Sequence, residues 1–333
     1  MRIAVIGAGA IGCLVAGYLK LKNEDVLLIG HPESVKAVRE KGISISGVRG
    51  TVSVRIDAAE RLDVDAGLVI LAVKTQDIQA ALKENVNGLH NAFLLTTQNG
   101  LQAEHIAAGY FDRERIFTSI VMFGATYLAP GTVVHNFEGS WIIGRLSGKP
   151  DENLLAVANT LNTIFPSVIT EDIKGMKYLK VFVNANNCIP AILGVSMQEA
   201  FADPFISRAA VAVWKEGMDI VSRTGTHLEG LPDFPVLRLT RLTSLPAEEA
   251  AKIFSGIMTS LSREPLYGSI LQSIRRGRPS EIDYINGAFV ALAKNNNLDA
   301  PLNERLVDLV HQVEREKKFL TRGEFLSAVK GLV

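Results

Sequence analysis

Cysteine is scarce in this sequence, and neither sign of charge is in excess. The 333 residues include only two cysteines, Cys13 and Cys188, which are far apart and lie among apolar residues. This usage is typical of a reducing compartment and indicates no disulfide. Lysine plus arginine and aspartate plus glutamate number 35 each, so no overall field attracts nucleic acid or an anionic membrane. The local basic cluster of Arg275, Arg276 and Arg278 has the ordinary interpretation of a solvated helix end.

Long apolar runs are also missing. No uninterrupted apolar stretch approaches the roughly 20 residues that a membrane-spanning helix needs. The apolar N-terminus carries glycines at fixed spacing, which is not the pattern of a secretory leader. Hydrophobic residues make up 47% and charged residues 21% of the chain, a balance typical of globular proteins. We therefore expect a soluble, cytoplasmic protein that is long enough for two domains.

The first half of the chain alternates short apolar runs with helical patterns, which predicts a parallel sheet with crossover helices. Residues 117–144 alternate instead and are punctuated by turns, which predicts antiparallel strands that finish the sheet. From about Glu171 onward the patterns are almost entirely helical. The predicted buried strands are "RIAVIG" (2–7), "DVLLIG" (25–30), "AGLVILAVK" (66–74) and "AFLLTTQNG" (92–100).

These patterns predict an α/β fold in two domains. A Rossmann-type domain is expected over residues 1–166 and a mostly α-helical domain over residues 167–333, with the boundary near Pro166.

A glycine-rich turn opens the chain. The run "GAGAIG" places Gly7, Gly9 and Gly12 between a predicted strand and a predicted helix, which is the context that dinucleotide binding requires. Gly7 allows the tight turn, Gly9 lets the backbone approach a pyrophosphate, and Gly12 lets the helix pack close to the strand. The alternative is a merely tight strand–helix turn. The predicted cofactor-binding residues of this turn are Gly7, Ala8, Gly9, Ala10, Ile11 and Gly12.

The end of the second strand bears on the choice between NAD and NADP. An NAD enzyme usually carries an acid there for the ribose hydroxyls, whereas this chain has His31, with Glu33 only inside the next predicted helix. The missing acid favours NADP, although no arginine stands there to bind a 2′-phosphate. Lys74, at the end of the third strand, offers a positive charge nearby; alternatively it is a solvated strand end.

A polar stripe runs along a helical stretch at residues 174–194, in which Pro190 is expected to break the helix. Apolar side chains point all around its axis, which indicates burial, yet Lys180, Asn184 and Asn187 share one face. Such a stripe offers a cation and amide donors to a small anionic ligand. The alternative is an internal polar network, which is credible for Asn187 but less so for Lys180, because burial lowers the pKa of a lysine toward proton-transfer use. Lys177 is placed nearer an exposed helix start and is assigned no chemistry.

Two further polar positions are candidates. Asn99 ends the fourth strand, where ligands of open α/β sheets bind; its alternative is a turn residue, because Asn-Gly favours turns. Glu281 and Asp283 open a helix that Ser280 is expected to cap, with Asp283 completing something close to a capping box. The apolar stripe of that helix leaves Glu281 at its edge, able to reach a cleft, and turns Asp283 to solvent.

The glycine turn, "VK" at 73–74, "QNG" at 98–100, "KxxxN" at 180–184 and "SEIDYING" at 280–287 occur in one order. Over essentially the whole chain, this set resembles the ketopantoate reductase (2-dehydropantoate 2-reductase) family. The run "EIDYING" is the most specific part, whereas many dehydrogenases share the glycine motif.

The resemblance implies roles for individual residues. It makes Lys180 the general acid that protonates the carbonyl oxygen and Glu281 its neighbour beside the substrate hydroxyl and the cofactor. Asn99, Asn184 and Ser269 are implied to hold the substrate, Asn99 also near the cofactor. Lys74 and His31 are implied to lie on the cofactor side.

The sequence departs from the family pattern on the substrate side. A family asparagine four residues after the one matching Asn184 is Cys188 here, so Asn187 or a neighbour would have to replace it. An aspartate often found four residues after the serine is Ser273, and the basic residue after the second strand is His31. These changes leave the reaction type better supported than the substrate.

The resulting hypothesis is NADPH-dependent reduction of 2-dehydropantoate to pantoate, a step of pantothenate biosynthesis. Two alternatives stay open: a paralogue that reduces another 2-oxo acid, and an NADP-binding sensor without turnover. The expected partner is a small-molecule 2-oxo acid, with no nucleic acid, no membrane and no metal. A homodimer is left open.

Overall fold

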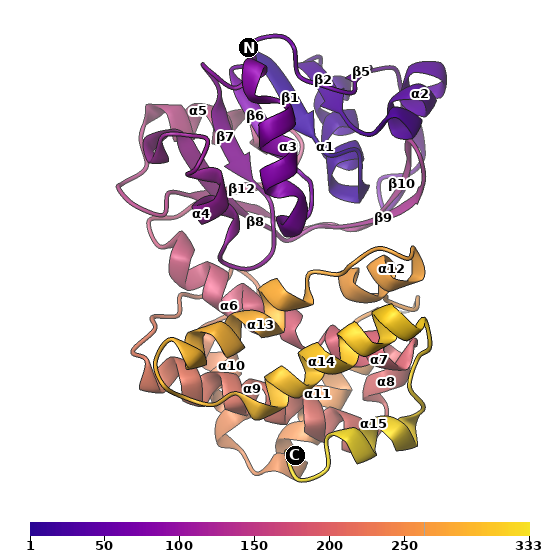
Figure 1. Ribbon diagram of the computed structural model, residues 1–333, viewed down its shortest axis with the longest axis vertical. Coiled ribbons are helices and arrows are strands. Elements are labelled where there is room, and N and C mark those ends of the chain that lie inside the picture. Colours follow the sequence, from indigo (N-terminus) through magenta and orange to yellow (C-terminus); the bar gives the residue numbers. More distant parts are fainter. Residues whose placement is uncertain (263) are drawn as a thin grey trace. The chain divides into compact units, whose positions relative to one another are not determined.

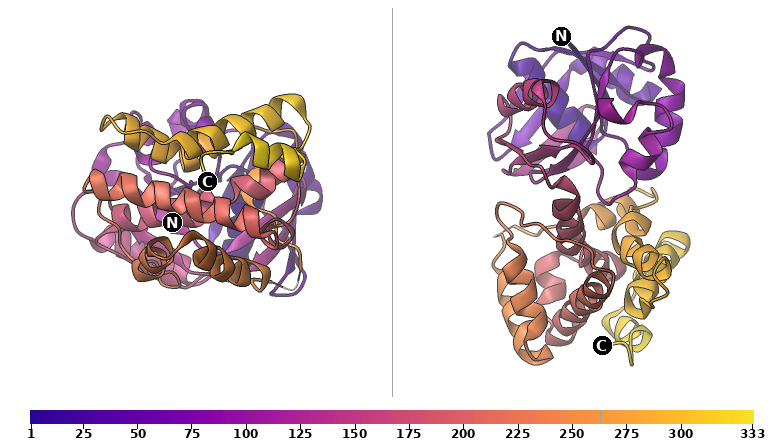
Figure 2. Two further views of the ribbon diagram at one scale, coloured as in Figure 1. Left: turned by 90° about the horizontal axis from the view of Figure 1, so that it is seen from below. Right: turned by 90° about the vertical axis from the view of Figure 1, so that its left-hand side faces the viewer.

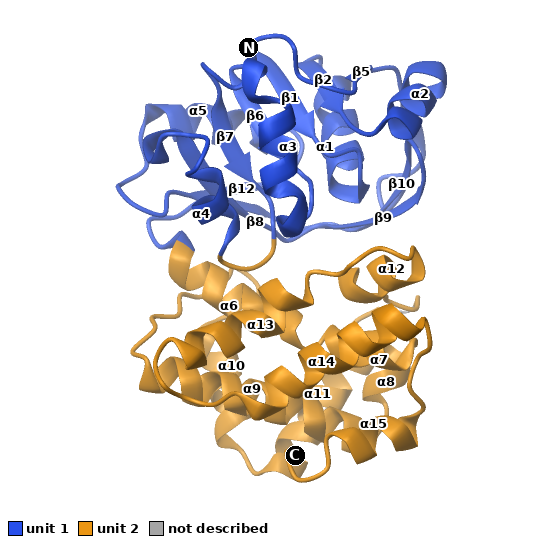
Figure 3. Ribbon diagram, viewed as in Figure 1, with its two compact units in different colours: residues 1–98, 102–173 blue, residues 99–101, 174–333 orange. Residues whose placement is uncertain are grey.

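The computed structural model describes residues 1–262 and 264–333, and the chain divides into two compact units (Figure 3). The first contains Met1–Gln98 and Gln102–Ile173, and the second contains Asn99–Leu101 and Lys174–Val333. The chain thus enters the second unit for good after Ile173 rather than near Pro166. The reason is a last strand, β12, which pairs in parallel with β11 and so belongs to the sheet of the first unit.

The first unit is built on an eight-stranded sheet with the order β12-β11-β8-β7-β6-β1-β2-β5 (Figure 1). The four predicted buried strands correspond to β1, β2, β6 and β7, and they are all parallel. Their carboxyl ends therefore lie at one edge of the sheet. The strands are β1 (Arg2–Ile6), β2 (Asp25–Ile29), β5 (Asp57–Ala59), β6 (Leu68–Leu71), β7 (Phe93–Thr96), β8 (Ile116–Val121), β11 (Trp141–Gly144) and β12 (Ser167–Ile169).

Both faces of this sheet are covered, as the near-continuous apolar runs of its strands require. Successive residues of β1 enter opposite cores: Ile3 and Val5 pack in one cluster with α1 and α5, and Ala4 and Ile6 in another with α3 and α4. Figure 2 shows helices on both sides of the sheet. The helices of this unit are α1 (Ala10–Leu21), α2 (Pro32–Lys41), α3 (Ile78–Glu84), α4 (Ala103–Ala107) and α5 (Glu152–Asn162), with 3-10 turns at Thr75–Asp77, Val86–Gly88 and Arg113–Arg115.

The prediction that residues 117–144 finish the main sheet was wrong in part. Strands β8 and β11 do belong to it, as an antiparallel pair. The hairpin of β9 and β10 instead joins β3 and β4 in a separate sheet of order β4-β3-β10-β9. The cause is a long-range parallel pairing of β10 with β3, which local alternation does not reveal. The strands of this second sheet are β3 (Ile43–Gly47), β4 (Val52–Val54), β9 (Gly124–Ala129) and β10 (Thr132–Phe137).

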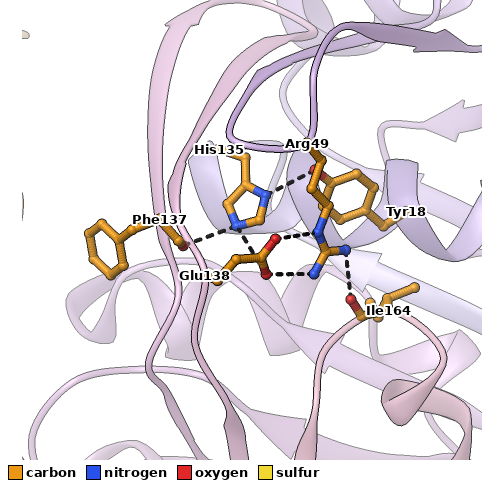
Figure 4. Close-up of polar contacts among 6 residues, drawn as sticks. All are labelled: Tyr18, Arg49, His135, Phe137, Glu138 and Ile164. Atoms are coloured by element: carbon orange, nitrogen blue, oxygen red, sulfur yellow. Dashed lines mark hydrogen bonds and ion pairs between the residues drawn. The ribbon is translucent and has the colours of Figure 1, made fainter. Parts of the chain in front are cut away.

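A polar cluster ties the second sheet to α1 (Figure 4). His135 of β10 is fully buried, and its Nε2 lies 3.0 Å from the carbonyl oxygen of Phe137. Because a carbonyl only accepts, Nε2 carries the proton and Nδ1 accepts the hydrogen bond from the hydroxyl of Tyr18, at 3.0 Å. Arg49 donates to both carboxylate oxygens of Glu138, at 2.6 and 2.7 Å, and its guanidinium lies 4.8 Å from the ring centre of Tyr18.

The second unit is helical, as the sequence predicts for this part of the chain. The long helix α9 packs against α11, α10 and α14, and α13 packs along α14 (Figure 1). None of the helices in the described part of the chain has the length and apolar character to cross a membrane. The helices are α6 (Ile173–Ala185), α7 (Cys188–Leu193), α8 (Met197–Phe201), α9 (Pro204–Arg223), α10 (Val236–Ser244), α11 (Ala247–Thr259), α12 (Ser269–Arg275), α13 (Ile282–Lys294), α14 (Pro301–Glu316) and α15 (Arg322–Ala328).

A buried polar network fixes α13 and α14 in this unit. The carboxylate of Glu216, on α9, accepts the backbone N–H groups of Leu302 and Asn303 at 2.8 Å each. These N–H groups belong to the first turn of α14, so a charged acceptor satisfies donors that have no partner within the helix. The amide of Asn286 on α13 donates to the side chain of Asn303 at 2.9 Å, and both asparagines are fully buried.

Candidate active site

The glycine turn after β1 has the close contacts that its spacing predicts. Gly7 has φ +116°, and a Cβ there would lie 2.7 Å from the backbone of Val73. A Cβ on Gly12 would overlap with the carbonyl oxygen of Gly7. Both positions therefore require glycine.

Gly9, the middle glycine of the motif, leaves open space instead of making a close contact. Gly9 is the N-cap of α1, no side chain caps that helix end, and a Cβ on Gly9 would meet nothing within 4 Å. The first turn of α1 also carries no acidic residue. The uncapped N–H groups and the open space beside Gly9 fit a phosphate group.

The ends of the neighbouring strands carry the other candidates of this unit. A Cβ on Gly30 would lie 2.7 Å from the Cβ of Ala8, so the end of β2 packs directly on the glycine turn. His31 follows it as the exposed N-cap residue of α2 and makes no capping hydrogen bond. Lys74 follows β6, on the other side of β1, as a half-buried N-cap residue of the 3-10 turn. Both residues thus stand at the carboxyl edge of the sheet.

Asn99 and Asn184 contact one another in the second unit. Asn184 donates from Nδ2 to Oδ1 of Asn99 at 2.9 Å, across 85 positions of sequence. Both side chains are half-buried. Each asparagine keeps amide groups beyond this bond, because one amide has two donor hydrogens and a carbonyl with two lone pairs.

The predicted helical stretch at residues 174–194 forms two helices, but the break comes earlier than the predicted position, Pro190. α6 ends at Ala185 and α7 begins at Cys188, with a turn between them. Pro190 explains the break, because it has no N–H to donate to the carbonyl of Asn186 four residues earlier. Ile189 donates to that carbonyl instead, at 3.3 Å. Asn187 is therefore the N-cap residue of α7 rather than part of a continuous stripe.

Lys180 lies in the middle of α6 and is partly exposed. Desolvation by the surrounding protein lowers the pKa of its ammonium to about 8. A lysine with this pKa is still mostly charged at neutral pH and releases its proton far more readily than an ordinary lysine.

The prediction that Lys177 stands near an exposed helix start was wrong. Its side chain is only 3% exposed, so it is more buried than Lys180. The reason is that α6 begins at Ile173, which is itself buried, and Lys177, four residues later, lies on the same face of the helix.

Glu281 and Asp283 differ in exposure as predicted, but the expected cap is different. Glu281 is the half-buried N-cap residue of α13, and Asp283 is exposed. No side chain caps the helix: the N–H of Ile282 lies 3.4 Å from the hydroxyl of Ser280, a long contact, and no capping box forms. The backbone N–H of Ser280 donates instead to Glu314 of α14, at 2.7 Å.

Asp283 was expected to meet only solvent, and this was wrong. Its Oδ1 accepts a hydrogen bond from Nε2 of His311, on α14, at 2.9 Å. Asn187 packs against Gly268, the residue before Ser269: a Cβ on Gly268 would be 3.1 Å from the Cγ of Asn187. Ser269 is exposed and begins α12.

Sequence reasoning gave no separate role to Gln98 and Gly100 of the "QNG" motif and missed Asn186. Gln98 is buried and donates to the carbonyl oxygens of Leu71 and Val73, and Gly100, with φ +83°, packs against Tyr284. Asn186, between α6 and α7, is 3% exposed, and neither of its amide atoms has a hydrogen-bond partner among the described residues. The Asn-Gly dipeptide was a signal for Gly100; no pattern marks Asn186.

Comparisons with known proteins agree over most of the chain. Residues 3–148 match the family "Ketopantoate reductase PanE/ApbA", and residues 172–314 match "Ketopantoate reductase PanE/ApbA C terminal". This chain belongs to the ketopantoate reductase family. The family prediction made from the motifs is thereby confirmed, and the chain is an oxidoreductase of the kind that acts on CH–OH groups.

Individual relatives span nearly the same length. The 2-dehydropantoate 2-reductase of Pyrococcus abyssi (strain GE5 / Orsay) is 31% identical over 313 residues, which cover 93% of this chain and 97% of that protein. The enzyme of the same name from Archaeoglobus fulgidus is 27% identical over 315 residues, covering 94% and 98%.

Solved structures confirm the predicted α/β fold. A D-mandelate dehydrogenase, in a ternary structure with NADH and anilino(oxo)acetate, has a TM-score of 0.81 at 24% identity and covers 95% of this chain and 99% of its own. A ketopantoate reductase of this family from Ralstonia eutropha JMP134 has a TM-score of 0.79 at 23% identity, with the same coverage.

Proposed function

We propose that this protein reduces 2-dehydropantoate to pantoate with NADPH, as a step of pantothenate biosynthesis. The observation that carries the proposal is the set of Lys180, Asn99 and Asn184 in the helical unit, with the lysine pKa lowered to about 8 and the two amides 2.9 Å apart. A 2-oxo acid substrate needs a proton donor for its ketone and hydrogen-bond donors for its carboxylate. The relatives named 2-dehydropantoate 2-reductase support the choice of substrate.

The proposed chemistry assigns one step to each residue. The nicotinamide cofactor, when bound, supplies a hydride to the ketone carbon. Lys180 donates a proton to the oxygen on which negative charge develops, and the desolvation that lowers its pKa brings its acidity near the working pH. Glu281, at the N-cap of α13, orients that ammonium and accepts from a substrate hydroxyl.

Substrate binding is assigned to the amides and the hydroxyl of the helical unit. Asn99 and Asn184 donate to the carboxylate and to the substrate hydroxyl with the amide groups that their mutual bond leaves over. Ser269, the first residue of α12, and Asn187, which packs against the preceding Gly268, extend the same binding surface. Cys188 takes no part, because it is fully buried and its thiol donates to the carbonyl oxygen of Ala185.

Cofactor binding is assigned to the first unit. The residues that hold the cofactor are Gly7, Ala8, Gly9, Ala10, Ile11, Gly12, His31 and Lys74, with Asn99 and Glu281 on the nicotinamide side. The uncapped first turn of α1 and the space at Gly9 fit a pyrophosphate. With no acid at the end of β2, the 2′-phosphate of NADPH meets His31 and Lys74 without charge repulsion.

The experiment that tests this function follows NADPH absorbance with 2-dehydropantoate and with a panel of other 2-oxo acids, including an aryl-substituted one. The proposal expects the highest kcat/KM for 2-dehydropantoate. A higher value for another 2-oxo acid would assign the protein to a paralogous reductase. Tight NADPH binding in calorimetry without turnover of any panel member would make it a sensor and overturn the proposal.

A further inference from the structure

The segment "QNG" at residues 98–100 is where the chain passes from one unit to the other. Gln98 is the last residue of the first unit before the passage, and Asn99–Leu101 belongs to the second. Gln98, Asn99 and Gly100 are each held by contacts within the unit to which the residue belongs.

Gln98 fixes the end of this segment in the first unit. Its side chain is 5% exposed, and its Nε2 donates to the carbonyl oxygens of Leu71 and Val73 at 2.8 Å each. A buried amide with two such bonds is costly to displace. The position of Gln98 is therefore fixed beside the end of β6.

Gly100 fixes the other end against α13 in the second unit. Its φ of +83° lies in the left-handed region that favours glycine. A Cβ at this position would overlap with the backbone carbonyl oxygen of Tyr284 and lie 3.1 Å from the Cβ of Tyr284. Tyr284 is in the first turn of α13, whose N-cap residue is Glu281. The backbone of the segment therefore rests directly on the turn that carries Glu281.

Asn99 is held between these two anchors and bonded to Asn184 on α6 at 2.9 Å. Although Asn99 follows a strand of the first unit, its contacts place it with the helical unit. The absence of a side chain at Gly100 lets this loop approach α13 closely, and the approach sets where the Asn99 amide stands relative to Glu281.

We propose that Gly100 is a positioning residue of the active site, which acts by docking the Asn99 loop on the first turn of α13. This inference rests on the proposed function, in which Asn99 and Glu281 meet the substrate. A side chain at position 100 would push the loop off α13 and misplace the Asn99 amide, and a misplacement of about 1 Å can cost on the order of a hundredfold in rate.

The test compares Gly100→Ala with Gly225→Ala. Gly225 also lies in the second unit in a left-handed conformation, φ +63°, but a Cβ there would meet nothing within 4 Å. Both variants therefore carry the same kind of backbone strain, and only one carries the collision. Gly100→Ala is expected to lower kcat/KM for the 2-oxo acid by roughly ten- to a hundredfold, with NADPH affinity in calorimetry close to the parent. Gly225→Ala is expected to keep the parental kcat/KM.

A second pair separates the collision from the strain of the left-handed conformation. Asparagine tolerates this conformation better than alanine but still has a Cβ, so Gly100→Asn should lose activity while Gly225→Asn does not. Circular dichroism at the assay temperature reports folding. Unfolding of Gly100→Asn alone would assign the contact to stability and overturn the positioning role.

A double-mutant cycle with Asn99→Ala decides whether Gly100 acts through Asn99. If it does, adding Gly100→Ala to Asn99→Ala should cost little more than Asn99→Ala alone. Fully additive losses in kcat/KM would overturn the inference while leaving the proposed function standing. Parental turnover in Asn99→Ala by itself would instead contradict the proposed function at this residue.

Discussion

His311 on α14 donates from Nε2 to Oδ1 of Asp283 in the first turn of α13, and the two atoms are 2.9 Å apart. The other ring nitrogen of His311 lies 3.1 Å from Oε2 of Glu314. Partial burial alone would lower the pKa of His311, but the carboxylates of Asp283 and Glu314 together raise it above its ordinary value. His311 thus joins α14 to α13, the helix whose N-cap residue is Glu281.

Asp283→Asn is expected to weaken this junction without stopping catalysis. A group with a raised pKa in the folded state stabilises fully below its ordinary pKa of 6.5, and this stabilisation is lost as pH rises through the raised value. Because the pair is partly exposed, the loss of unfolding free energy should be at most about 1 kcal/mol. Urea unfolding of the parent and Asp283→Asn should therefore differ more at pH 6 than at pH 9.

Glu281→Gln is the matched variant for that measurement. It should lower kcat strongly and change stability little, because Glu281 is assigned to the ammonium of Lys180. The reverse result, an inactive Asp283→Asn and an active Glu281→Gln, would exchange the roles of the two acids.

Lys180→Ala is expected to lower kcat by roughly a hundred- to ten-thousand-fold, the usual contribution of a general acid. NADPH should still bind, since its phosphates are assigned to the glycine turn. Lys174→Ala is the control, because Lys174 is on the same helix and exposed. Lys177 does not serve this purpose, since it is 3% exposed. Steady-state kinetics at saturating cofactor would refute the general acid if Lys180→Ala kept a near-parental kcat.

The pH dependence of kcat/KM should report the pKa of Lys180 in the free enzyme. A general acid acts only while protonated, and desolvation lowers the pKa of Lys180 to about 8. The rate of reduction should therefore be level below about pH 8 and fall about tenfold per pH unit above it. The residual activity of Lys180→Ala should not show this decline. An unbroken plateau to pH 10 in the parent would contradict the assignment.

The protein is expected to bind NADPH more tightly than NADH, because no acid follows β2 to repel the 2′-phosphate. Lys74→Ala should weaken NADPH and leave NADH nearly unchanged if this lysine attends the phosphate. Two calorimetric titrations of each protein measure the difference. Equal losses for the two cofactors would place Lys74 elsewhere, and a parental preference for NADH would reverse the cofactor assignment.

Acid should destabilise the first unit through His135. Burial lowers the pKa of this histidine, with an opposing effect of Glu138 and a further lowering by Arg49. As pH falls below the ordinary value of 6.5, the unfolded chain takes up the proton before the folded one does, so stability falls with it. Protonation also requires Tyr18 to give up its hydrogen bond to Nδ1.

Urea unfolding at pH 7.5 and 5.5 measures this effect. Arg49 lowers the pKa of Glu138 by direct hydrogen bonding. Protonation of Glu138 therefore reduces the stability of the folded protein only below the ordinary carboxyl pKa of 4.5. Relative to the parent, His135→Gln should lose less stability, or gain more, between pH 7.5 and pH 5.5, whereas His105→Gln, at an exposed position, should behave like the parent. An unchanged difference between the two pH values in His135→Gln would show that other groups cause it.

Local patterns were sufficient for much of the fold. The four buried strands follow from apolar runs, and the glycine turn follows from spacing, because each feature depends on residues that are neighbours in sequence. The pairing of β10 with β3 was not predicted, since it joins segments some 90 residues apart. A break was predicted at Pro190, whereas α6 already ends at Ala185, because the missing N–H of a proline affects the carbonyl four residues earlier.

The sequence predicted which residues form the candidate site but not the contacts that position them. The amides of Asn99 and Asn184 were identified separately, and their contact depends on the path of the chain after β7. Burial of Lys177 and the bond from His311 to Asp283 depend on which helices pack around α6 and α13, and one sequence does not give that.

The passage of Asn99–Leu101 through the helical unit has a consequence for recombining relatives. A chimaera joined after Ile173 would take its helices from one parent and residues 99–101 from the other. Gly100 would then contact the other parent's residue at position 284, and Asn99 would contact the other parent's residue at position 184. Exchanging residues 174–333 between relatives should preserve activity only when residues 99–101 are exchanged with them. The parts of the gene that determine substrate preference are therefore not contiguous.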